Sequence, residues 1–90
     1  MQHRIHVIFK GNVQGVGFRY TARGIAQRHS LTGYVKNITS GNVEVVAEGD
    51  HAQLVQFIEE VEREMAEFID SRSIDWTSPT EEFLAFSVRF

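Results

Sequence analysis

The segment GNVQGVGFRYTA, residues 11–22, combines residue types that can bind an anion. Gly15 and Gly17 allow the positive φ angles that bring several backbone N–H groups to one point. Arg19 follows at the start of a predicted helix, where N–H groups lack partners and the helix dipole attracts negative charge. Its planar guanidinium can bind two oxygens of one phosphoryl group. We therefore predict that the loop cradles a phosphoryl group and that Arg19 clamps it.

Two common phosphate-binding motifs do not fit this loop. A Walker loop requires a glycine, four residues and then Gly-Lys-Ser/Thr, and no lysine stands at that place. The dinucleotide fingerprint G-x-G-x-x-G requires a third glycine where Tyr20 stands. A glycine-rich stretch is also typical of a tight connection between a strand and a helix. On the loop alone, that simpler interpretation stays open.

Hydrophobic periodicity predicts the elements that must position this loop. Ile5, Val7 and Phe9 alternate as in a strand, whereas Leu54, Ile58 and Val61 follow helical spacing. Asp50 and Gln53 suit a capping box at the start of the second helix. The predicted elements are a strand at 4–10, a helix at about 18–29, a strand at 31–37, a turn at 39–41, a strand at 42–49, a helix at about 51–66, and one or two strands in the tail around a loop at 79–81.

This order, βαββαβ, predicts an α+β fold of the ferredoxin-like kind. Right-handed crossovers place two helices on one face of a four- to five-stranded, mainly antiparallel sheet. The first strand then lies beside the third, so that Asn37, at the end of the second strand, can approach the glycine loop. Asn37 alone is equally typical of a turn residue. The other face of the sheet can meet water, and His6, Lys10, Glu44 and Glu48 are predicted to point there.

Composition narrows the possible functions. Ninety residues, 42% of them hydrophobic, are enough for one domain spanning 1–90, and the chain has no cysteine. Its formal charge of −3 disfavours nucleic-acid binding, and no stretch could span a membrane. His3 and His6 face opposite sides of a strand, which argues against a shared metal. No signal peptide is recognisable, so we expect a cytoplasmic protein.

Three stretches, VQGVGFR at 13–19, GYVKN at 33–37 and FSVRF at 86–90, together resemble the acylphosphatase family. The resemblance covers essentially the whole chain, in the same order and at the same spacing. It implies hydrolysis of an acyl phosphate to a carboxylate and inorganic phosphate, with phosphate as product and inhibitor and with no metal or cofactor. It also implies that Arg19 binds the phosphate and that Asn37 orients the attacking water. The implied phosphate-binding residues are Val13, Gln14, Gly15, Val16, Gly17, Phe18 and Arg19.

The sequence departs from the family's pattern without losing either implied catalytic residue. The family often has arginine where Asn12 stands, tryptophan where Tyr34 stands and a polar residue where Ile38 stands. A Gly-Pro pair that is common after the second helix is missing from MAEFIDS, residues 65–71.

Three other functions share this order of elements. An RNA-recognition motif needs stacking aromatics on its third strand, which here reads NVEVVAEG. A metal carrier of similar shape would need paired cysteines. A non-catalytic regulatory domain also fits, as does the acylphosphatase-like domain of the carbamoyl-transferase that matures hydrogenases. Because the sequence runs from Met1 to Phe90 only, we expect a free-standing enzyme. We also expect a monomer.

Overall fold

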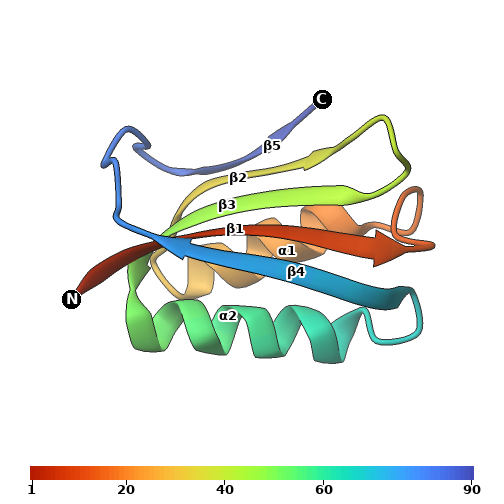
Figure 1. Cartoon of the computed structure of the whole chain (residues 1–90), viewed down its shortest axis with the longest axis horizontal. Coiled ribbons are helices and arrows are strands. Elements are labelled where there is room, and N and C mark those ends of the chain that lie inside the picture. Colours follow the sequence, from red (N-terminus) through yellow and green to blue (C-terminus); the bar gives the residue numbers. More distant parts are fainter.

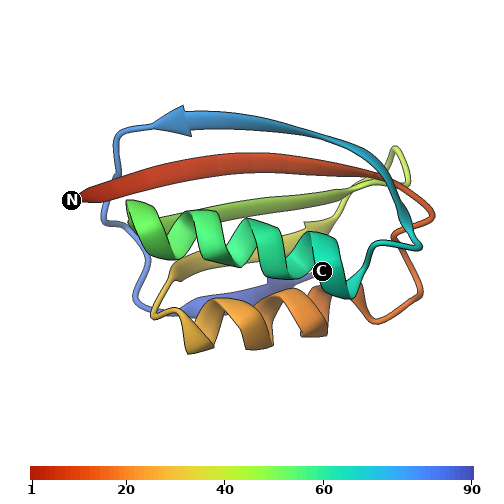
Figure 2. The ribbon, with the colours of Figure 1, turned by 90° about the horizontal axis from the view of Figure 1, so that it is seen from below.

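In the computed structural model, which describes residues 1–90, two helices cover one face of a five-stranded sheet (Figures 1 and 2). The predicted ferredoxin-like order is confirmed, and helix ends differ from the prediction by one or two residues. Neither helix is long and apolar enough to cross a bilayer. The elements are β1 (Gln2–Gly11), α1 (Phe18–Arg28), β2 (Thr32–Asn37), β3 (Val43–Asp50), α2 (His51–Glu64), β4 (Ile69–Thr77) and β5 (Phe86–Arg89).

The strand order β4-β1-β3-β2-β5 decides where the functional segments lie. All neighbouring strands are antiparallel except β2 and β5, which are parallel. Because β1 and β2 are each antiparallel to β3, they run in the same direction. The loop after β1 and the turn after β2 therefore meet at one end of the sheet (Figure 1).

The core lies between the sheet and the helices. Val7 pairs with Val45, which pairs in turn with Val35, so one face of three strands is continuously apolar and fully buried. Against it, α2 packs over β1 and β3, and α1 packs over β2 and β5. The rings of Phe9 and Phe18, with centroids 5.1 Å apart, tie the end of β1 to the start of α1. Full burial of such a side chain stabilises the fold by roughly 1.5–3 kcal/mol.

The predicted capping box at the start of α2 is wrong. Asp50 occupies the N-cap position, but its side chain makes no hydrogen bond to the helix. Its carboxylate instead accepts a hydrogen bond of 2.8 Å from the terminal ammonium of Met1, a charged donor that outcompetes a backbone N–H group. The side-chain oxygen of Gln53 lies 2.6 Å from Nδ1 of His29, so Gln53 links the two helices.

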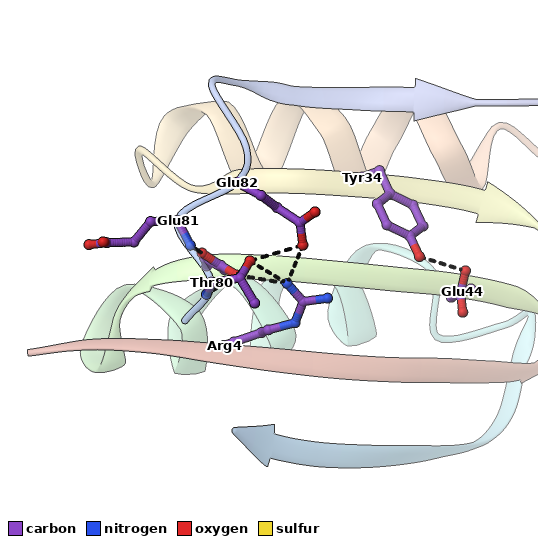
Figure 3. A network of polar contacts seen from close by, with 7 residues as sticks. Arg4, Tyr34, Glu44, Thr80, Glu81 and Glu82 are labelled. Carbon is purple, nitrogen blue, oxygen red and sulfur yellow. Dashed lines mark hydrogen bonds and ion pairs between the residues drawn. The ribbon is translucent and has the colours of Figure 1, made fainter. Parts of the chain in front are cut away.

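The second face of the sheet is only partly open. Lys10 is exposed, and His6 and Glu44 are half-buried. Glu48 lies on this face as predicted, but the expectation that it meets water is wrong because its side chain is only 4% exposed. The segment between β4 and β5 crosses the sheet above it (Figure 3). Sequence periodicity places Glu48 on this face but contains no information about which later segment covers the face.

Glu48 fastens that crossing segment to the sheet. Its carboxylate accepts hydrogen bonds from the N–H and the hydroxyl of Thr80, both 2.9 Å, from the N–H of Glu81 at 2.9 Å and from Arg4 at 2.8 Å. Burial by itself raises the pKa of Glu48, but these four donors outweigh it and hold the pKa at about 2. The carboxylate is thus charged and fully paired at neutral pH.

We predict that Glu48→Gln lowers the free energy of unfolding near pH 7 by on the order of 2–3 kcal/mol, measured by urea denaturation. The uncharged amide loses the charge-assisted bonds and turns an NH₂ group toward other donors. Because the pKa of Glu48 is lowered on folding, its stabilisation is present above about pH 4.5 and is lost as pH falls toward about 2. The difference in the free energy of unfolding between the variant and the wild type should therefore shrink as pH falls over that interval.

Glu82→Gln is the matched control for this prediction. Glu82 also contacts Arg4, at 3.1 Å, but its side chain is 57% exposed, so the change should cost less than about 1 kcal/mol. If both substitutions lowered the free energy of unfolding by the same amount, the burial of Glu48 would have no special importance.

Two glycines shape the chain where β1 passes into α1. Gly15 has φ 77° and Gly17, the N-cap residue of α1, has φ 80°, both in the left-handed region. A Cβ atom at either position would meet no other atom within 4 Å. The requirement for glycine is therefore one of backbone conformation and not of space.

We predict that Gly17→Ala and Gly24→Ala change stability in opposite directions. Alanine at position 17 must hold the left-handed conformation, which costs about 1–2 kcal/mol. Gly24 lies inside α1, where a Cβ also meets nothing within 4 Å, so alanine should stabilise the protein by roughly 0.5–1 kcal/mol. Thermal unfolding of both variants tests this, and a stabilised Gly17→Ala variant would contradict it.

Candidate active site

The loop after β1 and the end of β2 enclose a pocket of about 90 Å³ at the N-terminus of α1. This volume is about three times the ~30 Å³ that one water molecule takes in the liquid, which suits a small anion. The structure thus brings Arg19 and Asn37 together, as the strand order leads one to expect. The pocket is lined by Val13, Gly15, Gly17, Phe18, Arg19, Tyr20 and Asn37.

Apolar anchors hold the loop so that its main chain is left free. Val13 and Phe18 are buried, and Val16 packs against the core. No N–H group of residues 14–20 donates a hydrogen bond to another protein atom; the first to do so is that of Thr21, to the carbonyl of Gly17 at 3.1 Å. These donors add to the positive end of the α1 dipole, and the loop therefore presents a concentrated positive potential.

Arg19 lies half-buried beside these N–H groups. Its Nη1 donates one hydrogen bond, of 3.2 Å, to the carbonyl of Arg89, and its Cζ lies 4.6 Å from the centre of the Phe90 ring. A guanidinium has five N–H donors, so most of its hydrogen-bonding capacity is available to a ligand. Sequence reasoning missed the contribution of Arg89, because nothing in the local pattern of residues 86–90 indicates that β5 pairs with β2 and ends beside α1.

Two residues that the sequence assigns to the phosphate loop do not line the pocket. Val16 uses its side chain to pack on the core. The side chain of Gln14 donates hydrogen bonds to the carbonyls of Ile38 and Asn42, in the turn between β2 and β3. Only the main-chain groups of these two residues remain available to a ligand.

Three of the departures from the family's pattern, those at positions 12, 34 and 38, lie outside the pocket lining. Tyr34 stands on the second face of the sheet, where its hydroxyl donates to Glu44 at 3.0 Å and its ring lies 4.0 Å from Cζ of Arg89. Ile38 takes part in the turn through its carbonyl oxygen. Asn12 is exposed. None of them alters the shape of the pocket directly.

The lining determines which chemistry is possible. It contains one cation, one carboxamide, the side chain of Tyr20 and free N–H groups, with no carboxylate, histidine or lysine. Such a site can bind and orient a small dianion and neutralise charge that develops on it. It holds neither an imidazole nor a carboxyl group, the side chains that most often act as general base or acid.

Comparison with known proteins identifies the family of the chain. A family model described as Acylphosphatase matches residues 5–88. The chain is 42% identical to an acylphosphatase of Lactobacillus johnsonii over 80 residues, which cover 87% of this chain and 88% of that protein. It is 50% identical to an acylphosphatase of Bacillus velezensis over 58 residues, 64% of each protein.

A solved structure gives the same result. The crystal structure of acylphosphatase from Bacillus subtilis superposes on the chain with a TM-score of 0.88 and 32% identity, covering 98% of this chain and 99% of that one. Sequence and fold agree over nearly the whole length. The chain therefore belongs to the acylphosphatase family, hydrolases that act on acyl phosphates, and the enzyme class that its motifs predict is confirmed.

Proposed function

We propose that the pocket at the start of α1 is the catalytic site and that the reaction needs neither metal nor cofactor. One observation supports this most strongly: the unpartnered N–H groups of residues 14–20 and the guanidinium of Arg19 are gathered beside Asn37, which belongs to another strand. In this proposal the N–H groups and Arg19 hold the phosphoryl group, and the carboxamide of Asn37 holds the attacking water.

The reaction needs no reacting group other than water and the acyl phosphate. The water oxygen forms a new bond to phosphorus while the bond between phosphorus and the acyl oxygen breaks. The bonding electrons leave with the carboxylate, and a proton of the water passes to a phosphoryl oxygen. Charge is spread over the equatorial oxygens in a loose transition state, where fixed N–H donors and Arg19 stabilise it.

The chemistry of the leaving group explains why so few residues suffice. The conjugate acid of a carboxylate has a pKa of about 4, so the leaving group departs as an anion and needs no proton. An ordinary phosphate ester leaves as an alkoxide, which needs a general acid or a metal ion. The pocket offers no imidazole or carboxylic acid for this purpose, and this distinction defines the substrate class.

We predict that the protein hydrolyses benzoyl phosphate in the presence of EDTA and leaves an alkyl phosphate monoester intact. Inorganic phosphate should inhibit competitively, because it fits the same N–H groups and Arg19. Release of benzoate and phosphate measures the reaction. Loss of activity with chelator, or equal hydrolysis of the ester, would contradict the proposed chemistry.

We predict that Arg19→Ala and Asn37→Ala affect different kinetic constants. Arg19→Ala removes the charged clamp and should lower kcat/KM by about 100-fold or more while weakening inhibition by phosphate. Asn37→Ala should lower kcat by about 100-fold with phosphate inhibition preserved, because water is misplaced but the anion is still held. Initial rates and the phosphate inhibition constant separate the two roles.

Arg23→Ala is the control for Arg19. Arg23 lies one turn later in α1, with its Cζ 5.2 Å from the centre of the Tyr20 ring, and it does not line the pocket. Its removal should change kcat/KM by no more than about threefold. An equal loss in both variants would mean that only the overall positive potential of α1 matters, and a fully active Arg19→Ala variant would refute the assignment.

We propose that the protein acts as a monomer, as expected from the sequence. A cytoplasmic location likewise remains a proposal.

A further inference from the structure

The side chain of Gln14 points away from the pocket and into the turn between β2 and β3. Its Nε2 donates to the carbonyl of Ile38 and to the carbonyl of Asn42, each at 2.9 Å, and the residue is half-buried. Both hydrogens of the carboxamide are thus engaged, and only its oxygen is left, which would repel a phosphate. The side chain of Gln14 is therefore unsuited to bind the phosphoryl group directly.

The two carbonyls belong to a turn that is already closed by its own hydrogen bonds. The N–H of Ile38 donates to the carbonyl of Asn42, and the N–H of Gly41 donates to the carbonyl of Ile38, both at 3.0 Å. Gln14 thus joins a well-defined turn. Its two hydrogen bonds are the only ones between the loop at 12–17 and the turn at 38–42.

We propose that Gln14 is a positioning residue that sets the placement of Asn37 relative to the phosphate-binding loop, an inference that rests on the proposed function. Asn37 directly precedes Ile38, whereas Gln14 directly precedes Gly15. The carboxamide therefore connects the segment that holds the water to the segment that holds the phosphoryl group. In-line attack depends on that relation, and a displacement of about 1 Å can cost about 100-fold in rate.

This role affects turnover more than binding. The N–H groups at the start of α1 and Arg19 lie on one continuous segment, so the anion can still be held when the connection to the turn is lost. Gln14→Met keeps the length of the side chain and removes both donors. We expect its kcat to fall by about tenfold or more, while KM and the inhibition constant for phosphate stay within about threefold.

Gln56→Met is the matched control. Gln56 is exposed on α2 and its side chain makes no hydrogen bond within the protein, so the same substitution there should leave kcat unchanged. Benzoyl phosphate is the substrate in all assays, and urea denaturation confirms that each variant is folded. Wild-type kcat in Gln14→Met would overturn the positioning role.

A double variant tests whether Gln14 acts through Asn37. In the Asn37→Ala background, adding Gln14→Met should lower kcat by less than about twofold, because the group that it positions is already gone. If Gln14→Met lowered kcat in that background by the same factor as in the wild type, the inference would be overturned. An inactive wild-type protein would overturn the proposed function, whereas an active wild type with additive losses would overturn only the role of Gln14.

Gln14→Glu serves if the methionine variant does not fold. It keeps the shape of the side chain but donates only when its carboxyl is protonated. Its kcat relative to wild type should therefore rise as pH is lowered from about 7 toward about 5, as the carboxyl approaches its ordinary pKa. If the ratio of the variant's kcat to the wild-type kcat did not change with pH, the proposal would be contradicted.

Discussion

Backbone N–H groups without partners at the start of α1 are the constraint on which the site depends. A polar group that is buried without a partner costs about 1–3 kcal/mol, so a loop of this kind must stay accessible to solvent or to an anion. Val13 and Phe18 fix both sides of the loop in the core, and left-handed Gly15 and Gly17 turn the main chain outward between them. The apolar anchors and the glycines together maintain a donor-rich surface that the rest of the fold does not neutralise.

The strand order brings the second half of the site to this surface. β1 and β2 are not neighbours, because β3 lies between them, yet both end at the same edge of the molecule. Sheet hydrogen bonds therefore fix Asn37 relative to the end of β1 only through an intervening strand. The hydrogen bonds of Gln14 to the turn after β2 connect the two segments directly, although they are distant in sequence.

Much of this arrangement could be predicted from the sequence, because it follows from local periodicity. Alternating apolar residues indicated the strands, apolar residues at helical spacing indicated the helices, and the order of elements limited the fold to one topology. That topology also predicts that Asn37 lies near the loop. What the sequence could not supply was the choice of partner by polar side chains, which depends on segments far away along the chain.

Three residues illustrate that limit. Asp50 was predicted to cap α2, but the terminal ammonium of Met1 lies within 2.8 Å and binds it instead. Glu48 was predicted to face water, but the segment before β5 crosses above it. The side chain of Gln14 is able to donate to an anion or to protein carbonyls, and it donates to two carbonyls 24 and 28 residues later in the sequence. In each case the residue type allowed both outcomes, and only tertiary structure decided between them.

β5 connects the segment that Glu48 fastens to the sheet with the pocket at the start of α1. The chain leading into it is fastened by Glu48 and Arg4, whereas its far end places the carbonyl of Arg89 against Arg19. A neutral carbonyl can orient a guanidinium without cancelling its charge, and a carboxylate in the same place would compete with the anion. Although the chain carries a formal charge of −3, no carboxylate lines the pocket. The acidic residues that pair with arginine in this fold do so with Arg4, Arg28 and Arg72, so Arg19 keeps its full charge for a ligand.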